Sequence, residues 1–219
     1  MNTPSPVTVW LKEARANFLV LAVLLVAIGG AASSHAGMFN LPVFVLTVIG
    51  IVLAHASVNL HNEYSDWRTG IDALTPRTPF SGGSGMMQAG LAKPGHVRAA
   101  AWGTLLASFL IGLVLALKAG WPVLALMAAG GVTIVFYTDY IARWTLGEAA
   151  SGITLGSLVV LGAYFVQTGT FSGPVVWASV PAGILTSLLL FLNEFPDAEA
   201  DRAGGRRHIV IVIGKKRSS

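Results

Sequence analysis

The chain has 219 residues, of which 54% are hydrophobic and only 11% are charged, with a formal net charge of +4. The charged share is about half of that in soluble domains, which argues against a soluble globular protein. The absence of cysteine excludes disulfides and thiolate metal sites. No basic stripe interleaved with aromatic residues indicates a nucleic-acid partner.

Apolar segments dominate the chain after a polar lead-in over residues 1–16, which suits an interfacial helix. Segments of roughly 20 residues have the length needed to cross the hydrocarbon of a bilayer. Six follow in order: 17–36, 41–62, 96–117, 121–138, 149–168 and 174–195. Pro42, Pro94, Pro122 and Pro174 stand at the starts of four of them, where a missing N–H costs nothing. We therefore predict an all-α integral membrane protein, a multi-helix transmembrane bundle of six spans in one domain, residues 1–219.

The charges predict the orientation in the membrane. With the N-terminus in the cytoplasm, all Lys and Arg residues except Lys118 fall on the cytoplasmic side, as the positive-inside rule requires. The ten acidic residues fall on the same side, which that rule does not demand. We expect a multi-pass protein of the cytoplasmic (inner) membrane with its chemistry at the cytoplasmic face. The first segment also resembles a signal peptide, but it is longer than the usual apolar region of ~7–15 residues.

Two polar clusters close the second and sixth apolar segments. His55, Asn59, Asn62 and Asp66 recur at spacings of four, three and four, so a continuous helix places them on one face. Asn193, Asp197 and Asp201 repeat the pattern, and Asp72 adds a carboxylate after the first cluster. Pro196 removes a hydrogen bond within the second cluster and predicts a kink or a helix end. The echo indicates either a parallel repeat around a central cavity or convergence within one site.

Carboxylates and carboxamides without His or Cys at metal spacing favour Mg²⁺, which prefers one or two carboxylates completed by water and substrate phosphate. Two such half-filled sites suit a diphosphate held between two ions. The alternative is that the acids pair with Arg68, Arg77, Arg202 or Arg206 as solvated helix ends.

Other polar features on the same side leave two interpretations open. The Gly/Ser-rich loop between Asp72 and Pro94 suits a flexible lid or a phosphate cradle, with Arg77 and Lys93 supplying charge. Tyr137, Tyr140 and Trp144 suit an aromatic belt, or aromatic faces that stabilise a carbocation. His55 suits a core histidine better than a catalytic base. The other histidines, His35, His61, His96 and His208, show no ligand pattern.

The motifs resemble those of a known family. Asn59-Leu-His-Asn62-Glu-Tyr-Ser-Asp66, followed by Gly70-Ile-Asp72 and Pro76-Arg77, resembles the first aspartate motif of the UbiA superfamily of intramembrane prenyltransferases. Asn193-Glu-Phe-Pro-Asp197-Ala-Glu-Ala-Asp201-Arg202, followed by Gly205-Arg206-Arg207, resembles the second. Tyr137-Thr138, Leu146-Gly147-Glu148 and the segment 161–169 resemble the 1,4-dihydroxy-2-naphthoate prenyltransferase branch. The resemblance runs from Asn59 to Lys216.

The resemblance implies a helical bundle around a central cavity open to the cytoplasm and to lipid. It implies Mg²⁺-dependent transfer of an isoprenyl chain from a polyprenyl diphosphate to an aromatic acceptor, as in menaquinone biosynthesis. Asn62, Asp66, Asp72, Asn193, Asp197 and Asp201 would be the metal residues, and Asp66, Asp72, Asp197 and Asp201 the catalytic carboxylates. Arg77, Lys93, Tyr137, Arg143 and Arg202 would bind substrate. The partners would be the two substrates and the bilayer; the sequence specifies no oligomeric state.

Two departures from the family pattern stand out. Glu63 occupies a position where the branch usually has Asp, which keeps the carboxylate. The family fold has about nine membrane helices, whereas six are expected here, and the chain ends shortly after the second motif. We therefore expect a C-terminally short chain: a fragment, a subunit whose partner completes the cavity, or an inactive protein.

The alternative function class is a non-catalytic membrane protein or a transporter derived from the same fold. Intramembrane acids and a repeat also suit a transporter, but these acids crowd one mouth, and none lies in mid-span. A phosphatidyl-alcohol transferase is disfavoured because its characteristic Asp/Gly/Arg run is absent.

Overall fold

The computed structural model describes residues 4–75 and 82–218. Within those residues the structure is helical and contains no strands. The elements in order are α1 (Pro6–Glu13), α2 (Ala16–His35), α3 (Leu41–Thr69), α4 (Ile71–Leu74), α5 (Pro94–Ala119), α6 (Pro122–Phe136), the 3₁₀ turn η1 (Ile141–Arg143), α7 (Gly147–Ser151), the π-helical segment η2 (Gly152–Ser157), α8 (Leu158–Thr168), α9 (Gly173–Ala203), α10 (Ile209–Ile213) and α11 (Lys215–Ser218).

Among the described residues, five apolar helical segments are long enough to cross a membrane: α2, α3, α5, the continuous segment 147–168 and α9. The predicted fourth span forms the shorter helix α6, whose 15 residues extend about 22 Å at 1.5 Å per residue. The prediction of an all-α membrane bundle is therefore confirmed, with one of its six elements shorter than expected. Large apolar side chains such as Leu117 and Trp177 are exposed on the outside of the bundle, a position that suits contact with lipid.

The helix boundaries follow from local chemistry. Asn40 caps α3 by accepting a hydrogen bond from the backbone N–H of Val43, and each of the four predicted prolines lies in the first turn of its helix. Gly70 ends α3 with a φ of 77°, a conformation that favours glycine. Of the kink or helix end predicted at Pro196, the helix end is wrong, because α9 continues through this proline to Ala203. The kink stays a prediction.

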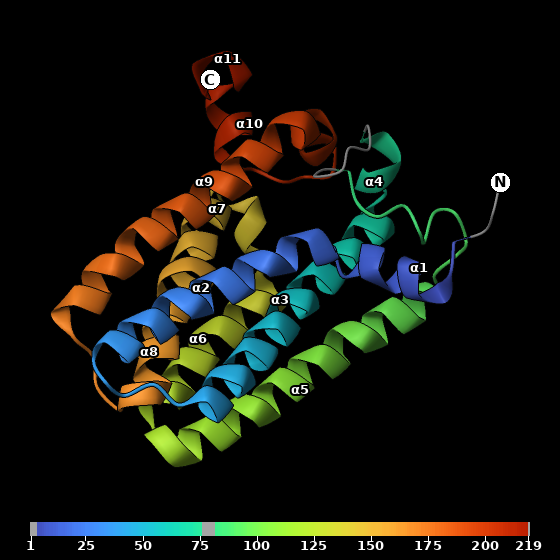
Figure 1. The fold of residues 1–219 in the computed structure, drawn as a ribbon. Coiled ribbons are helices and arrows are strands. Elements are labelled where there is room, and N and C mark those ends of the chain that lie inside the picture. The colour runs from blue at the N-terminus through green and yellow to red at the C-terminus, as the bar shows by residue number, and fades with distance from the viewer. Residues whose placement is uncertain (1–3, 76–81, 219) are drawn as a thin grey trace.

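The bundle places the two polar clusters at the same end. Figure 1 shows α1, α4, α10 and α11 gathered at one end, and the α2–α3, α5–α6 and α8–α9 connections at the other. The C-terminal halves of α3 and α9 both run toward the first end. Apolar packing supports this arrangement: Val26 of α2 and Val160 of α8 belong to one buried cluster. Leu60 of α3 shares a second cluster with Val97 and Ala101 of α5.

Two helices approach unusually closely at small residues. A Cβ atom added to Gly156 of η2 would lie 2.6 Å from the Cα atom of Gly183 in α9 and 3.0 Å from the carbonyl oxygen of Ala182. Real Cβ atoms essentially never approach backbone this closely, so the contact requires glycine. Across the same interface, the Ser157 hydroxyl donates to the carbonyl of Ser179 at 2.9 Å.

We predict that Gly156→Ala lowers stability by about 1–3 kcal/mol, the usual cost of overpacking, because α9 must move to admit the methyl group. Gly103→Ala in α5 is the matched control, since no described heavy atom lies within 4 Å of the Cβ it adds. Thermal unfolding in detergent should show a lower midpoint for Gly156→Ala only. Equal midpoints for the two variants would contradict the close approach.

Candidate active site

One cavity of about 850 Å³ receives both polar clusters. Asn62 and Asp66 of α3 line it together with Asn193, Asp197 and Asp201 of α9. The remaining wall is mostly apolar and comes from α3, α5, α6, α8 and α9, with residues such as Ile51, Leu105, Phe109, Met127, Leu158 and Leu189. The cavity therefore has a charged mouth and a long apolar interior.

Arg206 joins the two clusters. One of its guanidinium nitrogens contacts the Asp66 carboxylate, and the other donates to Oδ1 of Asp201 at 2.9 Å. Both carboxylates are buried, so an adjacent cation offsets part of the cost of removing their charge from water. The sequence offered Arg206 only as a partner of solvated helix ends, whereas the structure places these groups inside the cavity.

The amide and carboxylate oxygens nearest to this bridge differ in their partners. The Asn62 side-chain oxygen accepts a hydrogen bond from the Thr138 hydroxyl. In contrast, Oδ1 of Asp197 is buried without a hydrogen-bond partner among the described residues. Burying a polar oxygen without a partner is costly, so this oxygen is suited to contact a cation or a hydrogen-bond donor.

A second network lies beside the mouth. The Arg15 Nε donates to Glu63 at 2.7 Å, and both Glu63 carboxylate oxygens accept from the backbone N–H of Ser84, at 3.1 and 2.9 Å. The Ser84 hydroxyl in turn hydrogen bonds with Glu13 at 3.0 Å. Ser84 thus connects the Gly/Ser-rich loop to α1 and α3 by hydrogen bonds. Its backbone N–H already donates to the Glu63 carboxylate. Residues 76–81 of this loop lie outside the described part of the chain.

Asp72 belongs to this second network and is not part of the cavity lining. The Gln88 amide donates to it at 3.0 Å, and Gly83 packs directly against its carboxylate. Burial, followed by the nearby Glu63, raises the pKa of Asp72 to about 6. Asp72 therefore lies outside the cavity lining, although it is close enough to Asp66 to interact with it electrostatically.

The residues expected to bind substrate have different environments. Tyr137 lines the cavity, whereas Lys93, Arg143 and Arg202 are exposed and are not among the lining residues. Arg77 lies outside the described residues. Arg15 and Arg206 line the cavity instead, although the sequence patterns did not single them out as substrate contacts. For Arg206, the sequence feature that could have indicated this role is the Gly205-Arg206-Arg207 run directly after the second cluster.

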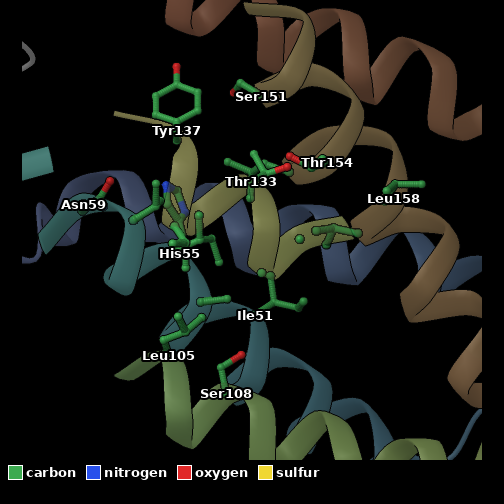
Figure 2. Close-up of a pocket in the computed structure, with 18 of the residues that line it drawn as sticks. Ile51, His55, Asn59, Leu105, Ser108, Thr133, Tyr137, Ser151, Thr154 and Leu158 are labelled. Carbon is green, nitrogen blue, oxygen red and sulfur yellow. The ribbon is translucent and has the colours of Figure 1, made fainter. Parts of the chain in front are cut away.

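The interior wall is shown in Figure 2. His55 and Asn59 project from neighbouring turns of α3, with Tyr137 above them and Thr133, Ser151 and Thr154 opposite. Ile51 continues the α3 wall toward Leu105 and Ser108 of α5. Asn59 donates to the carbonyl of Ala14 at 2.9 Å, but Nδ1 of His55 is buried without a hydrogen-bond partner in the described structure.

Comparison with known proteins agrees with this arrangement. A sequence profile of the UbiA prenyltransferase family matches residues 22–219, and the chain belongs to that family. The predicted resemblance is therefore confirmed.

Three curated relatives share the family. The chain is 30% identical over 181 residues to a 1,4-dihydroxy-2-naphthoate octaprenyltransferase of Bacillus subtilis, an alignment that covers 81% of this chain and 57% of the relative. It is 28% identical to the enzyme of the same name from Haemophilus influenzae, over 94% of this chain and 69% of the relative. It is 26% identical to a 2-carboxy-1,4-naphthoquinone phytyltransferase of Synechocystis, over 100% of this chain and 70% of the relative. These alignments thus span 57% to 70% of the length of the three relatives.

Glu13 in the second network leads us to predict that the stability of the folded protein depends on pH. Burial, followed by repulsion from Glu63, raises the pKa of Glu13 from 4.5 to about 7, while the Ser84 hydroxyl and Arg15 oppose the rise and Asp72 adds to it. The folded protein then keeps a proton that the unfolded chain loses between pH 4.5 and 7, so the free energy of unfolding falls as pH rises through this window. Glu13→Gln keeps an acceptor oxygen for Ser84 and removes the ionising group.

We therefore expect Glu13→Gln to be more stable than wild type above pH 7. Its free energy of unfolding should also fall less steeply than that of wild type between pH 4.5 and 7. Thermal unfolding in detergent across this range measures the effect. Glu199→Gln is the control, because Glu199 is an exposed acid on α9. Identical pH profiles for wild type and Glu13→Gln would show that Glu13 is not protonated in the folded state.

Proposed function

We propose that this chain transfers an isoprenyl group from a polyprenyl diphosphate to an aromatic acceptor resembling 1,4-dihydroxy-2-naphthoate, in the biosynthesis of a quinone. The observation that carries the proposal is the single cavity with Asn/Asp pairs from α3 and α9 at its mouth and an apolar interior behind them. The names of the naphthoate octaprenyltransferase relatives support the donor and acceptor classes. We place the mouth on the cytoplasmic side of the inner membrane, because the basic residues cluster at that end.

The mouth suits magnesium as the cofactor. Asn62, Asp66, Asn193, Asp197 and Asp201 offer only oxygen donors, the set that Mg²⁺ prefers, and Oδ1 of Asp197 has no partner in the described structure. Asp72 would contribute from the second network. Magnesium bound here would neutralise the diphosphate and help it to leave.

Arg206 and Arg15 add fixed positive charge to the same mouth. Their guanidinium groups present planar donor pairs that suit the oxygens of a diphosphate. Arg206 is held between Asp66 and Asp201, so a cation arriving at those carboxylates would free it to contact the substrate. We rank the contacts predicted from the sequence below these two: Arg77, Lys93, Arg143 and Arg202. Lys93, Arg143 and Arg202 do not line the cavity, and Arg77 lies outside the described residues.

The interior accounts for the rest of the reaction. The bond between the allylic carbon and the diphosphate oxygen breaks, and the diphosphate leaves with the electron pair. The Tyr137 ring offers a π face to the cationic carbon, and the apolar walls exclude water that would capture it. The electron-rich ring of the acceptor then forms the new carbon–carbon bond and regains its aromaticity by releasing a proton or substituent. No covalent enzyme intermediate is required.

We predict that Asp66→Asn and Asp197→Asn each lower Mg²⁺-dependent diphosphate release by at least about 100-fold, because each removes a charged ligand from the mouth. The measurement is diphosphate release from a polyprenyl diphosphate in the presence of 1,4-dihydroxy-2-naphthoate. Glu199→Gln is the matched control, because Glu199 lies between Asp197 and Asp201 in the sequence but its side chain is exposed. Wild-type rates in both Asn variants would refute the proposed metal role; no release by wild type, with or without added Mg²⁺, would refute the proposed activity.

A second prediction concerns the length of the donor. Gly131 of α6 lines the cavity, and no described heavy atom lies within 4 Å of the Cβ that a substitution would add. Gly131→Leu should therefore fill cavity volume and shift the preference toward shorter isoprenyl diphosphates. Competition between donors of different length measures the shift. Gly103→Leu, which adds the same side chain outside the cavity lining, should leave the preference unchanged.

A further inference from the structure

Three buried side chains converge beside the two aspartate clusters. Glu148 of α7, Glu194 of α9 and His208, which precedes α10, each offer a ligand atom within 4.8 Å of the other two. Their exposed fractions are 4%, 8% and 4%, so all three are removed from solvent. Glu194 and His208 also line the main cavity, which provides a path for a small ion.

Several polar atoms of this group make no hydrogen bond, although His208 lies within ion-pair distance of Glu194 and Asp201. Oε2 of Glu148, Oε2 of Glu194 and both ring nitrogens of His208 are buried without hydrogen-bond partners among the described residues. The nearby cation Arg206 already contacts Asp66 and Asp201. Two buried carboxylates facing each other are strongly destabilising unless a cation or a shared proton lies between them.

The spacing within the group suits an ion better than a direct hydrogen bond. Nδ1 of His208 lies 3.3 Å from Oε2 of Glu194 without hydrogen-bond geometry. Ligands at about 2.0–2.1 Å from a tetrahedral zinc ion are separated by about 3.3 Å along each edge. The nitrogen and the oxygen therefore have the separation of two ligands of one ion.

The surrounding contacts supply the outer shell that metal ligands need. The other ring nitrogen of His208, Nε2, lies 3.3 Å from Oδ2 of Asp201. A ligating histidine usually donates its second ring N–H to a carboxylate, and Asp201 is the carboxylate in reach of Nε2, although Nε2 makes no hydrogen bond in this structure. The second oxygen of Glu148, Oε1, accepts a hydrogen bond from the backbone N–H of Ile209 at 2.8 Å, so this carboxylate is also held in place.

We propose that Glu148, Glu194 and His208 form a site for a divalent transition metal, which adjoins the oxygen-only clusters at the mouth through Asp201. An imidazole nitrogen with two carboxylate oxygens favours an ion such as Zn²⁺ over Mg²⁺. A fourth position is left for water or a substrate oxygen on the cavity side. The proposal does not depend on prenyl transfer, because it rests only on the convergence of these ligands.

Zinc binding by the full chain in detergent tests the site. The protein is stripped with a chelator and titrated with Zn²⁺ against a chromophoric competitor, with excess Mg²⁺ present to occupy the oxygen-only clusters. We expect one tightly bound Zn²⁺ per chain, with its loss in His208→Leu and Glu148→Gln. Asp201→Asn should weaken binding by about 10–100-fold, as loss of an outer-shell partner does. His55→Leu is the matched control, since it removes another buried cavity histidine that has no place in the cluster, and should retain the ion.

X-ray absorption of the zinc-loaded wild type provides a reading that does not depend on any variant folding. One imidazole nitrogen and at least two carboxylate oxygens in the first shell would support the site. A first shell of oxygen alone, or equal zinc affinity in wild type, His208→Leu and Glu148→Gln, would overturn it. Absence of stoichiometric zinc in the wild type would also overturn the proposed site. A proton shared between Glu148 and Glu194 would then be what reduces the repulsion between their carboxylates.

Discussion

The contact of Arg206 with Asp66 and Asp201 is the interaction on which the polar end of the bundle depends. Arg206 and Asp66 are 140 positions apart in the chain, yet their side chains meet in a buried setting. Removing either partner would leave a charge in a medium that solvates it poorly. The bridge therefore holds the C-terminal ends of α3 and α9 together and fixes the width of the cavity mouth.

The membrane imposes the complementary constraint. Backbone polar groups in hydrocarbon must be satisfied within the helices, and charged side chains are tolerated only toward the interior of the bundle or toward water. Apolar side chains consequently cover the outer faces, while Asn62, Asp66, Asn193 and Asp197 turn inward. The same separation gives the cavity its two characters: a charged mouth for an anionic head group and an apolar interior for a hydrocarbon chain.

Much of this arrangement was predictable from local patterns. The spacing of His55, Asn59, Asn62 and Asp66 placed them on one face of a helix, and all four line the cavity. Of the two outcomes predicted at Pro196, a helix end did not occur, because a proline in a long packed helix loses one hydrogen bond without ending the helix, and α9 continues to Ala203. Lys93, Arg143 and Arg202 were chosen for their charge and their side of the membrane, neither of which specifies which way a side chain points.

The sequence by itself determined the helical class, five of the membrane-crossing helices and the two clusters at one end, since helical periodicity and span length are properties of contiguous residues. Only the tertiary structure decided which cations meet which acids. Arg206 contacts carboxylates of two helices, Asp72 lies near Arg15 and Glu63 beside the mouth, and His208 approaches Glu148 and Glu194. These groupings depend on how distant helices pack, because apolar packing sets the distances between groups that lie far apart in the chain.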